Sequence, residues 1–130
     1  MIGLPRPRRV LDASALMAYV WPEPGADAVE IEGSVVSAVN WAEVGQKFAS
    51  RGQDLARWRA SFAAVGFDLT PFTETSAEAA AALWTRTRAL GLSLGDRACL
   101  ALAAELGVPA VTADRAWAGL DVGVEVVVVR

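Results

Sequence analysis

Histidine is absent from this chain of 130 residues. Its absence excludes Ser–His and Cys–His catalysis, imidazole–zinc sites and histidine general bases. There is one cysteine, Cys99, so no disulfide can form within the chain, and its apolar surroundings predict a buried, inert thiol. An enzyme with this composition would depend on carboxylates, hydroxyls, arginines, the single Lys47, or a bound metal or cofactor.

Long apolar runs are also missing. No stretch approaches the roughly 18–20 residues that a bilayer-spanning helix needs. The basic start "MIGLPRPRRV" is followed by "VLDASAL", in which Asp12 interrupts any apolar core of a signal peptide. We therefore expect a cytoplasmic location and no contact with a membrane.

The chain has no excess of positive charge. Its 12 basic and 15 acidic side chains give a net charge of −3, which argues against a protein that coats nucleic acid by neutralising phosphates. Hydrophobic residues make up 54% of the chain, which excludes a disordered chain. The length fits one domain over residues 1–130.

Short apolar runs alternate with helical patterns along the chain, which predicts parallel strands joined by crossover helices. We expect strands at 8–11, 33–39, 66–72, 109–112 and 124–129. We expect helices at 13–20, 38–50, 53–64, 74–90 and 93–106, and a helical turn near 114–119. The predicted fold is α/β, a three-layer α/β/α sandwich around a mainly parallel sheet of about five strands.

Four acidic residues stand where such a fold binds ligands, at the carboxyl ends of its strands. Asp12 follows the first strand in "VLDAS", and Asp114 follows the strand at 109–112 in "VTADR". Glu43 lies one turn after Asn40 in "SAVNWAEV", and Asp96 lies at the start of the apolar helix 93–106. The predicted topology brings these acids toward one edge of the sheet.

Each acid also has a purely structural interpretation. Asp12 and Asp114 precede helical stretches and suit the N-cap position. Glu43 can form a solvated pair with Lys47 on the face opposite the apolar stripe of Trp41, Val44 and Phe48. Asp96 stands three residues after Ser93, as in a capping box.

The four acids together favour a metal site. Like charges at ~5 Å and an effective dielectric constant of ~20 repel by ~3 kcal/mol per pair, so such a cluster needs a cation or raised pKa values. Hard oxygen donors without Cys or His indicate Mg²⁺ or Mn²⁺ rather than zinc. A hydroxyl or amide accompanies each acid: Ser14, Asn40, Ser93 and Thr112.

The chain resembles the PIN-domain family and, within it, the VapC-like toxins of type II toxin–antitoxin modules. The segments that carry the resemblance are "VLDASALMAYV", "SAVNWAEV", "LSLGDRACLALAAELGVPAVTADRAW" and "VEVVVVR". The family's acidic residues map onto Asp12, Glu43, Asp96 and Asp114. Its supporting hydroxyl and amide positions map onto Ser14, Thr112 and Asn40.

The resemblance implies a metal-dependent endoribonuclease that acts as the toxin of a toxin–antitoxin pair. The four acids would hold one or two Mg²⁺ ions, for which Mn²⁺ can substitute. The implied partners are an RNA substrate, a VapB-like antitoxin and a second copy of the chain in a homodimer. The alternative is a PIN-like binding or scaffold protein with little or no turnover.

One departure from the family pattern is the segment "GLPRPRR" ahead of the first strand, where such toxins usually begin almost at the strand. It leaves two expectations for residues 1–7, namely a flexible segment or an artefact of the chosen start codon.

The surface charge looks different once the four acids are assigned to metal. Setting these four aside from the 15 acidic side chains leaves 11, against 12 basic ones. We expect five arginines near the edge of the site or its approaches: Arg6, Arg8, Arg9, Arg97 and Arg115. Arg97 also suits an ion pair with the neighbours of Asp96 or a surface cap. Core packing and a groove for a partner helix both suit Trp21, Trp58 and Trp84.

Overall fold

A single parallel sheet organises the structure, a computed structural model that describes residues 6–130. Its strand order is β3-β2-β1-β4-β5, and every neighbouring pair is parallel. The strands are β1 (Arg9–Leu11), β2 (Ser34–Ser37), β3 (Asp68–Thr70), β4 (Ala110–Thr112) and β5 (Val126–Val128). The predicted fold class and the predicted strand positions are confirmed.

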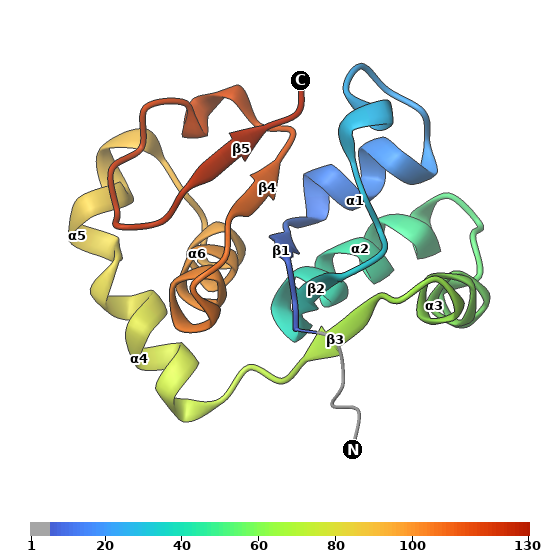
Figure 1. The fold of residues 1–130 in the computed structure, drawn as a ribbon, viewed down its shortest axis with the longest axis horizontal. Helices are drawn as coiled ribbons and strands as arrows, with labels where there is room; N and C mark the ends of the chain where they lie inside the picture. The colour runs from blue at the N-terminus through green and yellow to red at the C-terminus, as the bar shows by residue number, and fades with distance from the viewer. Residues whose placement is uncertain (1–5) are drawn as a thin grey trace.

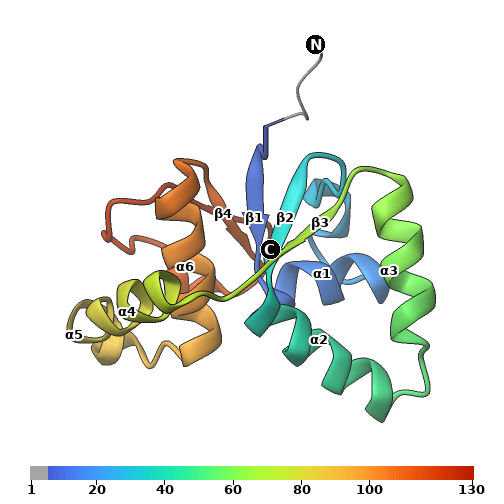
Figure 2. The same cartoon turned by 90° about the horizontal axis from the view of Figure 1, so that it is seen from below.

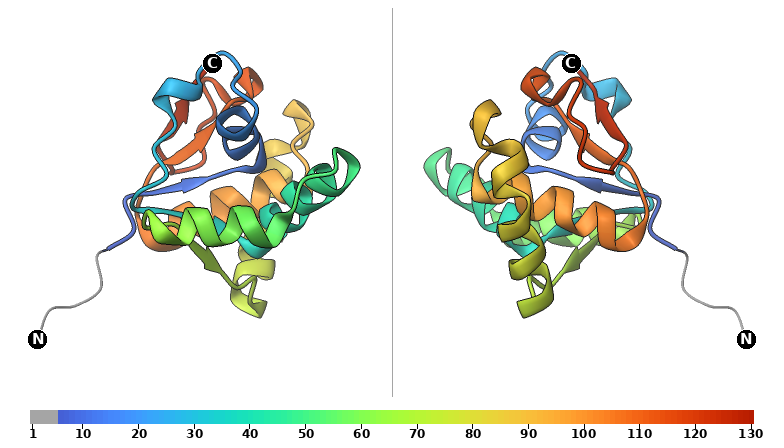
Figure 3. Two further views of the ribbon diagram at one scale, coloured as in Figure 1. Left: turned by 90° about the vertical axis from the view of Figure 1, so that its right-hand side faces the viewer. Right: turned by 90° about the vertical axis from the view of Figure 1, so that its left-hand side faces the viewer.

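Helices cover both faces of this sheet (Figure 1). On one side lie α1 (Ala13–Val20), α2 (Ala38–Ser50) and α3 (Leu55–Ala64). On the other lie α4 (Glu74–Ala82), α5 (Trp84–Thr87) and α6 (Leu94–Leu106), with the strands between the two groups (Figure 2). Figure 3 shows the first group in its left view and the second in its right view.

Successive side chains of a strand point to opposite faces of the sheet, so the hydrophobic core consists of two clusters, one on each face. Leu11 of β1 packs in the cluster that contains Leu16 of α1 and Phe48 of α2. Its neighbour Val10 packs in the other cluster, which contains Leu100 of α6. Both faces of the central strands are thus covered, and every residue of β2 and β4 is buried.

The predicted helix at 74–90 is interrupted. The structure divides it into α4, α5 and the 3₁₀ helix η2 (Arg88–Leu90). The hydroxyl of buried Thr87 donates to the carbonyl of Leu83 at 2.8 Å, and such a bond to the backbone one turn earlier disturbs a helix. Two further 3₁₀ helices are η1 (Ala26–Ala28), which the sequence did not predict, and η3 (Arg115–Trp117), at the predicted turn.

Within residues 6–130 no helix is both long and apolar enough to cross a bilayer. The expectation of flexibility at residues 1–7 falls mostly on residues outside this range.

Candidate active site at the carboxyl edge of the sheet

Asp12 is the most enclosed of the four acids. It follows β1 directly and forms the N-cap of α1, where one carboxylate oxygen accepts a 2.8 Å hydrogen bond from the backbone N–H of Ala15. Thr112 at the end of β4 donates to the other oxygen at 2.6 Å, and Ser14 donates to the carboxylate at 2.7 Å. Only 3% of Asp12 is exposed, so this carboxylate is buried and held in place by its three hydrogen-bond donors.

Burial raises the pKa of Asp12 to about 6. The hydrogen bonds from Thr112, Ala15 and Ser14 favour the ionised form but do not offset the loss of hydration. The charge of Asp96 raises the pKa further. Asp96 therefore lies close enough for its charge to act on Asp12.

Asp114 reaches the same edge because β4 is the neighbour of β1 in the sheet. Its backbone N–H donates at 3.0 Å to the Thr112 hydroxyl that holds Asp12. One of its carboxylate oxygens accepts from the N–H of Ala116 at 2.9 Å and caps η3. Asp114 therefore both caps η3 and lies next to the Thr112 hydroxyl that holds Asp12.

Asp96 forms the predicted capping box with Ser93. The Ser93 hydroxyl accepts from the N–H of Asp96 at 3.1 Å, and Oδ2 of Asp96 accepts from the N–H of Ser93 at 2.9 Å. The other carboxylate oxygen, Oδ1, has no hydrogen-bond donor among residues 6–130. The cap therefore leaves half of this carboxylate available.

Glu43 reaches the site through Asn40, as the position of both residues on α2 predicts. The Asn40 side chain is 1% exposed, and its Nδ2 donates to Oε1 of Glu43 and to the carbonyl of Gly95, both at 2.9 Å. The predicted pair of Glu43 with Lys47 is wrong. In the described part of the chain, ion pairs join Arg9 to Glu30 and Arg130 to Glu23.

The thiol of Cys99 on α6 lies within reach of the charges of three of the acids. Cys99 is fully buried, as predicted. Burial raises the pKa of this thiol well above its ordinary value, and the charges of Asp12, Asp96 and Glu43 raise it further. These acids come from the N-cap of α1, from α6 and from α2, and the charge of each acts on Cys99.

The donor chemistry of this cluster fits a hard divalent cation. Asp96, Asp114 and Glu43 each place one oxygen on a donor of the chain and leave the other without one among residues 6–130. Oδ1 of Asn40 is buried and has no partner in the described structure. Carboxylate and amide oxygens are the ligands that Mg²⁺ and Mn²⁺ prefer.

The spacing of the cluster is wider than that of a closed metal site. Within residues 6–130 no three acidic or cysteine side chains stand close enough to hold one ion together. Carboxylates that face one another without a cation between them repel. A closed site therefore requires the free oxygens of Asp96, Asp114 and Glu43 to turn toward Asp12.

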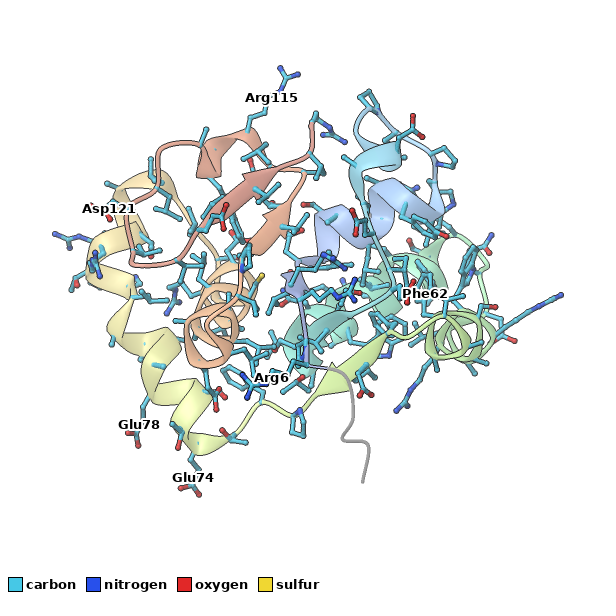
Figure 4. All side chains as sticks on the ribbon, viewed as in Figure 1. Arg6, Phe62, Glu74, Glu78, Arg115 and Asp121 are labelled. Atoms are coloured by element: carbon cyan, nitrogen blue, oxygen red, sulfur yellow. The ribbon has the colours of Figure 1, made fainter. Side chains whose placement is uncertain are left out.

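Most of the arginines expected near the site lie elsewhere. Arg8 and Arg9 precede or begin β1, at the opposite edge of the sheet from the acids, and Arg6 and Arg8 line a hollow of about 800 Å³ there. Arg97 donates to the carbonyl of Ala80 in α4 at 2.9 Å. Arg115 follows Asp114 and projects into solvent (Figure 4).

The three tryptophans do not share one groove. Trp21 and Trp58 both pack against Phe48, with ring centroids 5.1 and 6.1 Å from it. Trp84 is 48% exposed on α5, across the sheet from them (Figure 1). The core interpretation holds for the first two.

Sequence reasoning missed Gly95, whose contact with Glu43 shapes the site. A Cβ at this position would lie 2.2 Å from Oε1 of Glu43. The signal was a glycine in the first turn of a helix whose other residues are good helix formers, since glycine is unfavourable there.

Comparison with known proteins agrees with this fold. The PIN domain family profile matches residues 9–122. A chain in a toxin–antitoxin complex from Klebsiella pneumoniae has a TM-score of 0.69 at 21% identity, with 86% of this chain and 92% of that chain covered. FitAcB from Neisseria gonorrhoeae has a TM-score of 0.63 at 20% identity, with 92% and 96% covered.

A third similar structure is PAE2754 from Pyrobaculum aerophilum. Its TM-score is 0.59 at 18% identity, with 92% of this chain and 83% of that chain covered. At these identities the likeness to all three concerns the fold. No curated protein matches the chain in sequence.

Proposed function

Because the chain belongs to the PIN domain family, we propose that it is a Mg²⁺-dependent endoribonuclease and the toxin of a toxin–antitoxin pair. PIN domains are generally nucleases that use divalent metal ions. The observation that carries the proposal is a set of hydrogen bonds that bring the acids to one edge of the sheet. The Thr112 hydroxyl donates to Asp12 and accepts from the N–H of Asp114, and the Asn40 amide joins Glu43 to Gly95, the neighbour of Asp96. None of the four is ion-paired among residues 6–130.

The four acids have different parts in this proposal. Hydrogen bonds from Thr112, Ser14 and the backbone fix Asp12, so its carboxylate keeps one position in the site. Asp12 would hold Mg²⁺ together with the free oxygens of Asp96, Asp114 and Glu43. When bound, Mg²⁺ supplies activation of water and neutralisation of charge for in-line displacement at phosphorus.

The supporting polar groups serve the acids. The hydroxyls of Ser14 and Thr112 each donate their one proton to Asp12, and their oxygens lie 3.2 Å apart. Their hydroxyls also accept from the N–H groups of Ala113 and Asp114. These contacts tie the end of β1 to the end of β4, so both hydroxyls keep Asp12 in position.

The proposed partners are RNA, a VapB-like antitoxin and a second copy of this chain, with Mn²⁺ as an alternative ion and the cytoplasm as the place of action. An antitoxin partner is supported by the similar chain in the Klebsiella pneumoniae toxin–antitoxin complex. An RNA substrate is supported by the nuclease character of the family.

A cleavage assay tests the proposal. Purified protein, freed of any antitoxin, should cut a structured RNA in the presence of Mg²⁺ or Mn²⁺ and stop when EDTA is added. Asp96→Asn should abolish cleavage and keep the fold, because an amide oxygen can still accept from the N–H of Ser93. RNA binding that is equal with and without metal, and no cleavage, would identify a scaffold protein instead.

A further inference from the structure

The contact between α2 and α6 at the acidic site has an unusual construction. Glu43 is exposed overall, yet its carboxylate lies directly on Gly95 in the first turn of α6. A Cβ built on Gly95 would lie 2.2 Å from Oε1, 2.7 Å from Cδ and 2.9 Å from Oε2 of Glu43. Real Cβ atoms essentially never approach other atoms this closely. Any side chain at position 95 would displace this carboxylate.

The same two residues are joined by Asn40. Its buried Nδ2 group donates one hydrogen bond to Glu43 and one to the carbonyl of Gly95, each at 2.9 Å. Both donor hydrogens of the amide are thereby used. The three residues form a closed arrangement in which α2 supplies the carboxylate and α6 supplies the surface on which it rests.

The backbone conformation at position 95 does not require glycine. Its φ is not in the left-handed region, unlike that of eight other glycines of the chain, and glycine weakens a helix relative to alanine. A residue that is unfavourable for its helix and faces a carboxylate is better explained by the space it leaves for that carboxylate.

We propose that Gly95 and Asn40 are positioning residues that hold the Glu43 carboxylate beside Asp96. This inference rests on the proposed metal site, because it gives Glu43 its place among the ligands. Gly95 acts by leaving space, and Asn40 acts by fixing the orientation of Glu43.

The variant Gly95→Ala tests the proposal because the obstacle it meets is the end of a flexible side chain. Glu43 can swing into solvent, so the fold is retained and the helix is as stable or more stable. The matched control is Gly45→Ala in α2, whose Cβ would meet the end of Leu55 at 2.9 Å, away from the acids.

Binding of Mn²⁺ to the metal-free protein is the first readout. Gly95→Ala should bind Mn²⁺ about 10- to 100-fold more weakly, as is usual when a group that orients a ligand is lost. Gly45→Ala should bind as the unaltered protein does, and thermal unfolding should show both variants folded. Equal affinity of Gly95→Ala and Gly45→Ala would overturn the proposal.

A double-variant cycle separates positioning from a general structural effect. Glu43→Ala alone should weaken Mn²⁺ binding, and the addition of Gly95→Ala should weaken it no further, because there is then no carboxylate to displace. Losses that add in full would show that Gly95 acts on something other than Glu43.

A readout without metal keeps this inference apart from the proposed function. In ¹⁵N-labelled metal-free protein, Gly95→Ala should shift the side-chain amide signals of Asn40 and speed their exchange with water, and Gly45→Ala should not. If the unaltered protein binds no Mn²⁺, the proposed function fails and the amide signals alone decide the positioning roles. Unchanged Asn40 signals in Gly95→Ala would refute those roles.

Discussion

At the scale of the residue, Asp12 shows how a carboxylate can be well hydrogen-bonded and still unfavourable when ionised. Thr112, Ser14 and the N–H of Ala15 all donate to it, yet burial raises its pKa to about 6. A nearby divalent cation would lower this pKa again. Keeping Asp12 ionised at neutral pH therefore costs the fold free energy, and a bound cation would lower this cost.

The pH dependence of stability tests this view. The folded protein holds the Asp12 proton more tightly than the unfolded chain, whose pKa is near the ordinary 3.8. The protonated Asp12 carboxyl therefore contributes to the free energy of unfolding in full below about pH 4, and this contribution is lost as pH rises through about 6. A shift of this size is worth roughly 3 kcal/mol.

Urea unfolding in EDTA at several pH values measures the effect, with Asp12→Asn as the comparison. The variant should lack the loss between pH 4 and 7 and should be more stable than the unaltered protein at pH 7. Parallel pH profiles for the two proteins would contradict the assignment.

At the scale of the element, the start of α6 combines a helix cap with a position next to the other acids. Ser93 and Asp96 cap the helix, and Asp96 directly follows Gly95, on which the Glu43 carboxylate rests. The sequence offered capping and catalysis as alternatives for Asp96. The geometry makes them compatible, because capping occupies Oδ2 alone.

Two substitutions at this cap separate capping from catalysis. Ser93→Ala removes the hydroxyl that accepts from the N–H of Asp96, so it should lower the free energy of unfolding by about 1 kcal/mol. Cleavage should largely survive, since the carboxylate remains. Asp96→Asn should have the opposite profile, with nearly unchanged stability and no cleavage. Chemical denaturation measures the stability of both variants, and an RNA cleavage assay measures their activity. Equal loss of activity in the two variants would refute separate roles for the cap and the carboxylate.

The elements differ in how far the sequence predicts them. Apolar periodicity and caps such as Ser93 and Gly107 placed α6 within a residue of its ends, because these signals are local. The break after α4 depends on the bond between Thr87 and Leu83, which the pattern of 74–90 does not reveal. The site's acids were predictable from strand order, whereas the contact of Glu43 with Gly95 depends on how α2 packs on α6.

At the scale of the whole molecule, charge is separated along the strand direction. The acids occupy the carboxyl edge, and Arg6, Arg8 and Arg9 lie at the amino edge. The expectation that these arginines approach the site was wrong because they precede β1 and therefore stand at its other end. Of the five arginines expected near the site, Arg97 and Arg115 adjoin the acids, and the side chain of Arg97 is held by the carbonyl of Ala80.

RNA binding should therefore depend strongly on metal and weakly on salt. Fluorescence anisotropy with a structured RNA, with Ca²⁺ in place of Mg²⁺ to slow cleavage, should show affinity that EDTA abolishes. Few phosphate contacts predict a slope of log K against log salt no steeper than about −2. Tight binding in EDTA with a steep slope would indicate a nucleic-acid-coating protein.

The most direct measurement is the anomalous diffraction of a crystal soaked in Mn²⁺. We expect one or two manganese peaks among the carboxylates of Asp12, Glu43, Asp96 and Asp114. A crystal with no peak there at millimolar Mn²⁺, or with manganese bound only elsewhere on the molecule, would contradict this expectation.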